Sequence, residues 1–204
     1  MTEVQPKPAS PETVPGRSCG SCSLCCKIVS VRELGKPENK WCDHFKAGRG
    51  CSIYETRPGS CQRFYCGFMR KADFSEEWRP SRAHFVLYWD YTGNRMIVHV
   101  DPTHPNAWKE EPYYRQLKWM SRQAAEGRHI IVRIKERLIV ILPHKDYDLG
   151  EVNDGDVVQV IPFDGPMGRQ YHAQKVPKER VSPELAERAV SVVGPKDMPP
   201  EVAP

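Results

Sequence analysis

The sequence has no long apolar run, and outside residues 19–66 it has no cysteine. No segment approaches the roughly 18 consecutive apolar residues of a transmembrane helix. The opening residues, Met1 to Pro8, lack the apolar centre of a secretory signal. Glycine-rich phosphate loops, nucleophile elbows and zinc-protease motifs are absent as well. We therefore expect a cytoplasmic protein without a membrane partner. The sequence also excludes the classes of nucleotide-binding protein and hydrolase that these motifs define.

What the sequence does contain is a dense group of cysteines near its start. The first four form the pattern C-x-x-C-x-x-C-C, and four more follow singly. Thiolates bind metals tightly, and eight of them would fill two four-coordinate sites. A disulfide framework is the alternative, but it needs an oxidising compartment. The pattern therefore favours metal ligation, with these candidate ligands: Cys19, Cys22, Cys25, Cys26, Cys42, Cys51, Cys61 and Cys66.

The spacing of the first three cysteines indicates one kind of centre. Cys19, Cys22 and Cys25 form C-x2-C-x2-C, the triplet with which bacterial ferredoxins bind three irons of a [4Fe–4S] cluster. The fourth ligand would come from farther along the chain, and both Cys61 and Cys66 are candidates. An iron–sulfur cluster is thus the slightly preferred cofactor.

A second centre is indicated because neighbouring side chains such as Cys25 and Cys26 rarely bind one tetrahedral ion together. Structural zinc sites use separated ligand pairs. Cys42-x-His44 with Cys51 fits that usage, and Cys26 would complete the set. His44 could bind the metal directly or support a ligand through a hydrogen bond. Zinc therefore remains open as the cofactor.

Positive charge is concentrated in the same region. From Arg17 to Lys71, Lys and Arg outnumber Asp and Glu by 11 to 4, within a formal net charge of +4 for the chain. A nucleic-acid surface is one explanation, but these charges form no run or stripe. Charge balance against ionised thiolates is the other explanation, so a nucleic-acid partner is not supported. Arg57 and Arg63 are expected either to donate hydrogen bonds to sulfur or simply to balance charge.

The chain divides into four predicted parts. Residues 1–16 include four prolines and few apolar side chains, so they are expected to be a disordered arm. Residues 17–71 form an irregular, metal-stapled cysteine module without long hydrophobic periodicity. Residues 82–192 form a small domain of β-hairpins and one main helix, and residues 193–204 form a disordered tail. The predicted fold class is therefore α+β.

Local patterns predict the following elements. β-Branched and aromatic runs predict strands, a stripe of apolar residues every three to four positions predicts the main helix, and Ser-Pro-Glu predicts the start of a last helix. The expected turns and strands are short helical turns at 24–29 and 53–57, a hairpin of 84–91 and 95–100 around Gly93-Asn94, a helix at 110–126, strands at 130–134, 138–142, 157–161 and 171–176, and a short helix from Ser182.

The cysteine module also resembles a known family. Lys36-Pro37, Trp41-Cys42-x-His44 and the stretch from Cys51 through Arg57-Pro58 to Cys66 follow the C-x-x-C-x-x-C-C opening in the order seen in the YkgJ-type cysteine-cluster proteins. That family is described as zinc- or iron-chelating. The resemblance covers about residues 17–70, and it implies that all eight cysteines are ligands. It does not extend to residues 82–204.

Two functional hypotheses follow. The first is an iron–sulfur protein with a redox or cluster-dependent role. The second is a binding or regulatory protein whose cysteine module is held by zinc, and whose later strands contact a protein or nucleic-acid partner. Because zinc is redox-inert, the identity of the metal separates the two. No acid, base or nucleophile beyond the cysteines is indicated, so catalytic activity stays unassigned.

Overall fold

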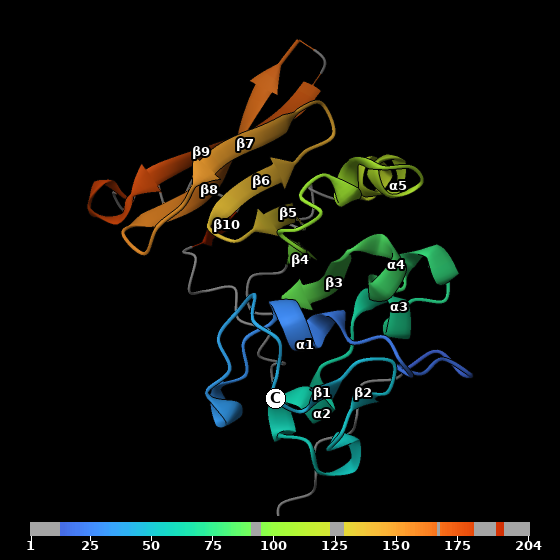
Figure 1. Cartoon of the computed structure of the whole chain (residues 1–204). Helices are drawn as coiled ribbons and strands as arrows, with labels where there is room; N and C mark the ends of the chain where they lie inside the picture. Colours follow the sequence, from blue (N-terminus) through green and yellow to red (C-terminus); the bar gives the residue numbers. More distant parts are fainter. Residues whose placement is uncertain (1–12, 91–94, 123–128, 167, 182–190, 194–204) are drawn as a thin grey trace, which may run out of the picture.

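The computed structural model describes residues 13–90, 95–122, 129–166, 168–181 and 191–193, and it has an α+β fold (Figure 1). Most helices are very short, and α5 is the longest one described. The helices and 3-10 turns are α1 (Leu24–Ile28), η1 (Arg32–Leu34), η2 (Tyr54–Thr56), α2 (Gly59–Arg63), α3 (Gly67–Arg70), η3 (Glu76–Trp78), α4 (Pro80–Ala83), η4 (Ala107–Lys109), α5 (Tyr113–Met120) and η6 (Lys178–Arg180). The strands are β1 (Phe45–Lys46), β2 (Gly50–Cys51), β3 (Phe85–Asp90), β4 (Arg95–Val100), β5 (His129–Ile134), β6 (Arg137–Ile141), β7 (Asp146–Glu151), β8 (Asp156–Gly165), β9 (Gly168–Pro177) and β10 (Ser191–Val193).

A five-stranded sheet in the order β3-β4-β5-β6-β7 forms the centre. Its neighbours are antiparallel except β4 and β5, which run parallel. A parallel pair requires the chain to cross over, and η4 and α5 lie on that connection. β8 and β9 form a long hairpin with β10 added beside β8, and β1 and β2 form a separate ribbon. Figure 1 shows the hairpin at one end of the molecule and the ribbon at the other.

Both faces of the central sheet are buried. Successive side chains of a strand point to opposite faces, and in β3 Val86 and Tyr88 belong to one core whereas Phe85 and Leu87 belong to the other. The first core also holds α1 residues and the inner side of β8 and β9, and the second holds residues of α3, η4 and α5. This double burial explains why these strands are nearly continuous apolar runs rather than alternating patterns.

The cysteine segment contributes to both cores. Leu24 and Ile28 of α1 pack in the first core, and Phe68 and Met69 of α3 pack in the second. The prediction that metal bonds would hold this segment in place of a core did not anticipate these contacts. Helices α1 and α3 each supply only two large apolar residues, which is too few to produce a recognisable period.

The α+β class is confirmed, and most of the predicted strands are present with changed limits. The main helix is shorter than predicted at its start, because α5 begins at Tyr113 rather than Glu110. β8 and β9 extend well beyond the predicted strands 157–161 and 171–176. β7 was not predicted, and neither were β1, β2 and β10.

Several predictions fall on residues outside those described. These are the Gly93-Asn94 turn, the end of the main helix at 123–126, the helix from Ser182, and most of both terminal segments. Of the N-terminal arm, residues 13–16 are described, and the Val14 amide donates to the Met69 carbonyl at 2.8 Å. Among the described helices, none combines the length and the apolar character required to cross a bilayer.

Candidate metal centre

The eight cysteines line two adjoining pockets. The outer pocket, of about 100 Å³, is lined by seven of them together with His44. The inner pocket, of about 30 Å³, is lined by Cys66 and by three cysteines that it shares with the outer pocket. The shared residues are Cys19, Cys22 and Cys25, and those found only in the outer pocket are Cys26, Cys42, Cys51 and Cys61. Tertiary folding thus gathers cysteines that are spread over residues 19–66.

Short backbone connections bring the later cysteines to the first four. The Cys22 amide donates to the Cys19 carbonyl at 2.8 Å, which closes the first turn. The Cys42 amide donates to the Cys26 carbonyl at 3.0 Å and so joins two distant segments. In the β1–β2 ribbon, Phe45 pairs with Cys51, which returns Cys51 to the same wall as Cys42.

Helix α1 gives the adjacent cysteines different surroundings. Successive residues of an α-helix point about 100° apart, and Cys25 packs against the first core whereas Cys26 faces only the outer pocket. Cys25 nevertheless lines the outer pocket together with Cys26, so both thiols are within reach of that pocket. The two candidates for the remote ligand lie in different pockets. Cys66 lines the inner pocket and Cys61 lines the outer one.

The thiols influence one another electrostatically. Burial, with smaller contributions from Cys19 and Cys22, raises the pKa of Cys66 to about 12. Burial likewise raises the pKa of Cys61, where the neighbours that add to the effect are Cys26, Glu33 and Cys42. Buried, mutually repelling thiols ionise with difficulty, so a bound cation would be the group that stabilises their thiolate forms.

One thiol in the cluster, that of Cys26, has a pKa below its ordinary value. The Cys25 thiol forms a hydrogen bond with Cys26, which is the largest cause of a Cys26 pKa lowered to about 7 and of a Cys25 pKa raised well above its ordinary value. The Lys36 ammonium also lowers the Cys26 pKa. Cys26 is therefore the first thiolate expected in the outer pocket at neutral pH.

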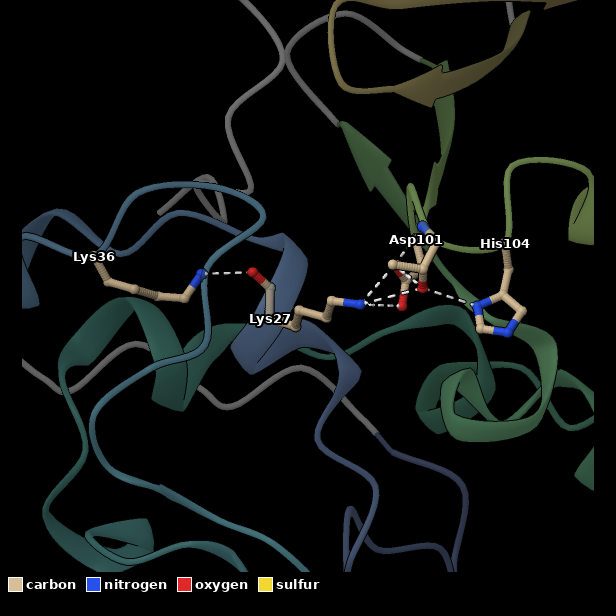
Figure 2. Close-up of polar contacts among 5 residues, drawn as sticks. Lys27, Lys36, Asp101 and His104 are labelled. Carbon is tan, nitrogen blue, oxygen red and sulfur yellow. Dashed lines mark hydrogen bonds and ion pairs between the residues drawn. The ribbon is translucent and has the colours of Figure 1, made fainter.

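Polar contacts fix α1 at its C-terminal end (Figure 2). The Lys27 ammonium, next in sequence to Cys26, contacts both carboxylate oxygens of Asp101 at 2.7 and 2.8 Å. Asp101 is almost fully buried and also accepts a hydrogen bond from Thr103. The Lys27 carbonyl accepts a hydrogen bond from the Lys36 ammonium at 3.0 Å. These contacts link the helix that carries Cys25 and Cys26 to the end of β4.

Other predicted site residues have different contacts from those expected. The Arg57 guanidinium donates to the Tyr54 and Cys61 carbonyls, at 2.6 and 3.2 Å, rather than to sulfur. Arg63 is exposed. The Tyr54 hydroxyl, which the sequence did not single out, forms a hydrogen bond with Cys19. In the sequence Lys36 belongs only to the family-like motif, and in the structure it lines the outer pocket.

The thiols are not assembled into a ligand set. All eight are free cysteines and partly buried. Across the described part of the chain, no three His, Cys, Asp or Glu side chains are grouped closely enough to hold a metal ion. Ion binding would therefore require the cysteine side chains and their turns to move toward one another within the pockets.

Gly50 provides a test of how the ribbon meets the first cysteine turn. Its φ is +82°, and an added Cβ would lie 2.8 Å from the Gly20 carbonyl oxygen, between Cys19 and Cys22. We expect Gly50→Ala to lower the free energy of unfolding by about 1–2 kcal/mol through the left-handed backbone, and by about 1–3 kcal/mol more through the overlap. Denaturant unfolding at one fixed metal content measures the change.

Gly48 is the matched control for this prediction. Its φ is +73°, but no atom lies within 4 Å of an added Cβ. Gly48→Ala should therefore show only the backbone contribution. Equal destabilisation by the two alanine variants would contradict a close approach of the ribbon to the Cys19–Cys22 turn.

Comparisons with protein-family models, with curated proteins and with solved structures gave no match to this chain.

Proposed function

We propose that the protein binds metal through its eight cysteines and acts in the cytoplasm as an iron–sulfur protein. The observation that carries the proposal is the gathering of all eight free thiols around two adjoining pockets. The thiols come from turns, from helices α1 and α2 and from strand β2. A purely structural role would not require every cysteine of the chain to meet there. Soft thiolate ligands suit iron–sulfur clusters and zinc.

Iron is preferred for the group formed by the ferredoxin-like triplet. Cys19, Cys22 and Cys25 share the inner pocket with Cys66, which gives the four thiolates that a [4Fe–4S] cluster needs. When bound, such a cluster supplies one-electron transfer at a potential set by its surroundings. The chain's own residues would hold it, partly shield it from solvent and donate hydrogen bonds to it, as Tyr54 does to Cys19.

The resemblance to the YkgJ-type cysteine-cluster proteins supports metal binding without deciding the metal. Its ordered motifs include all eight cysteines, Lys36 and His44. The inner pocket is small. A cluster would therefore require the pocket wall to open farther than a single ion would. Both occupants therefore have to be distinguished by measurement.

Zinc in a binding or regulatory protein is the second candidate. It is favoured by the outer pocket, which is lined by Cys42, three residues before β1, by Cys51 at the end of β2, and by His44. Separated pairs of this kind are usual in structural zinc sites. Cys26 and Cys61 would complete a four-thiolate set there. In this case the later strands would contact a protein or nucleic-acid partner.

The two candidates are distinguished by the composition of protein purified without oxygen. We expect iron, acid-labile sulfide and broad visible absorption. An iron–sulfur cluster contains the iron and the sulfide, and the bonds between them give the absorption. Elemental analysis and sulfide determination on the same sample provide the measurement. Colourless protein with stoichiometric zinc would establish the alternative, and metal-free protein with paired cysteines would contradict both.

A further inference from the structure

Lys36 is an unusual lysine, because it is only 8% exposed. Its ammonium donates to three backbone carbonyls, those of Lys27 at 3.0 Å, of Pro37 at 2.9 Å, and of Val29. Figure 2 shows the first of these contacts. Two of the carbonyls belong to the end of α1 and its cap. The bonds hold the charged group in one place at the wall of the outer pocket.

Neutral carbonyls solvate this ammonium but do not neutralise it. Lysines are almost never this buried unless they are paired. In the described part of the chain Lys36 forms no ion pair with a carboxylate, and the nearby Glu38 pairs instead with Arg133 at 2.8 Å. Burial lowers the pKa of Lys36, and the neighbours that oppose this effect most are Cys26 and Cys42, ahead of Glu38. The buried charge is thus placed for thiolates.

We propose that Lys36 is a fixed counter-charge for the thiolate group of the outer pocket, and that it favours occupants whose complex with the cysteines keeps a net negative charge. A divalent ion with four thiolates carries −2, and so does a [4Fe–4S]²⁺ cluster with four thiolates. The inference rests on the proposed function. It adds a residue that selects the net charge of the metal–thiolate complex in the outer pocket. Lys36 acts through the thiolates and is not itself a ligand.

Three substitutions separate charge from hydrogen bonding. Lys36→Arg keeps both, Lys36→Gln keeps donors without charge, and Lys36→Met keeps neither. Lys40→Gln, at an exposed position four residues away, is the matched control. The measurement is zinc affinity by competition with a chromophoric chelator, under reducing and oxygen-free conditions. Far-UV spectra and thermal midpoints of each variant accompany it.

We expect the Gln and Met variants to bind the ion of the outer pocket about 10–100-fold more weakly, as is typical when a group supporting metal ligands is lost. The Arg variant and Lys40→Gln should stay close to the unchanged protein. The ion of the inner pocket should be held as before in every variant, and so provides an internal reference.

The outcomes distinguish this inference from the proposed function. If the unchanged protein binds no metal, the proposed function fails. If it binds zinc and Lys36→Gln binds it equally well, only the counter-charge is overturned. The counter-charge is also overturned if Lys36→Met weakens zinc binding and Lys36→Gln does not, because hydrogen bonds to α1 would then be sufficient for full affinity. Should the Met variant fail to fold, the comparison of Gln with Arg decides.

Discussion

Replacing Cys66 by serine should remove the metal held at the inner pocket and leave that of the outer pocket in place. Cys66 lines only the inner pocket, and Cys61 lines only the outer one. Cys61→Ser should therefore have the complementary effect. Each variant should lose the metal of one pocket and keep that of the other, and the double variant should lose nearly all of it. This is the largest effect expected, because metal–thiolate binding can contribute about 10–16 kcal/mol to the folding of a small site.

Metal and sulfide per chain, measured after oxygen-free purification, test this division. Ser23→Ala is the control, since Ser23 is a buried residue of the same cysteine run and lines the outer pocket without sulfur. Its metal content should be unchanged. A double variant that loses no more metal than either single variant would show one shared centre in place of two.

Acidification should destabilise the fold through His99 and His129. Both are buried in the central sheet, and their ring nitrogens form no hydrogen bond within the described residues. Burial is the main cause of a His99 pKa lowered to about 3, with the charges of Arg133 and Lys36 adding to it. Burial beside Arg95 lowers the His129 pKa to about 4.

The sign and size of the effect follow from proton linkage. Below the ordinary pKa of 6.5 the unfolded chain binds protons that the folded protein does not. Stability is therefore full above about pH 6.5 and falls as the pH drops toward 3 for His99 and 4 for His129. At pH 5 each histidine should cost about 2 kcal/mol relative to pH 7, and the two together about 4 kcal/mol.

Urea unfolding between pH 4.5 and 7 checks this prediction. His99→Met and His129→Met should each reduce the slope of stability against pH by about 1.4 kcal/mol per pH unit in the acid range. Thiols and metal contribute equally to the pH dependence of stability in all variants prepared with the same metal content. The difference between the slopes of two variants therefore gives the contribution of the substituted histidine. His172→Met changes an exposed histidine and is the control. An unchanged slope in both buried variants would contradict the assignment.

Part of the fold was predictable because local chemistry was sufficient. The apolar runs at 85–90 and 95–100 predict strands, and they form β3 and β4 in antiparallel register. β7 was missed because its sequence, Asp-Tyr-Asp-Leu-Gly-Glu, is polar and only partly buried at the edge of the sheet. Pairing with β6 supplies its stability, and such pairing leaves no apolar period in a sequence.

The partition of the candidate site was beyond sequence reasoning for a similar reason. Spacing identifies Cys19, Cys22 and Cys25 as one group, but it allows either Cys61 or Cys66 to join them. The choice depends on α2 and α3, which direct these two cysteines to different pockets. Lys36, between Gly35 and Pro37, looks like a surface turn residue, and it is buried because the chain folds back from Lys36 to pair with Val31.

The sequence by itself determined the composition of the cysteine-rich segment, the α+β class and the positions of the main strands, since each depends on residue type and local spacing. Only the tertiary structure decided which thiols share a pocket, which lysine is buried beside them, and that the segment lies against both cores of the sheet. These outcomes depend on contacts between residues far apart in the chain, and no local pattern specifies such contacts.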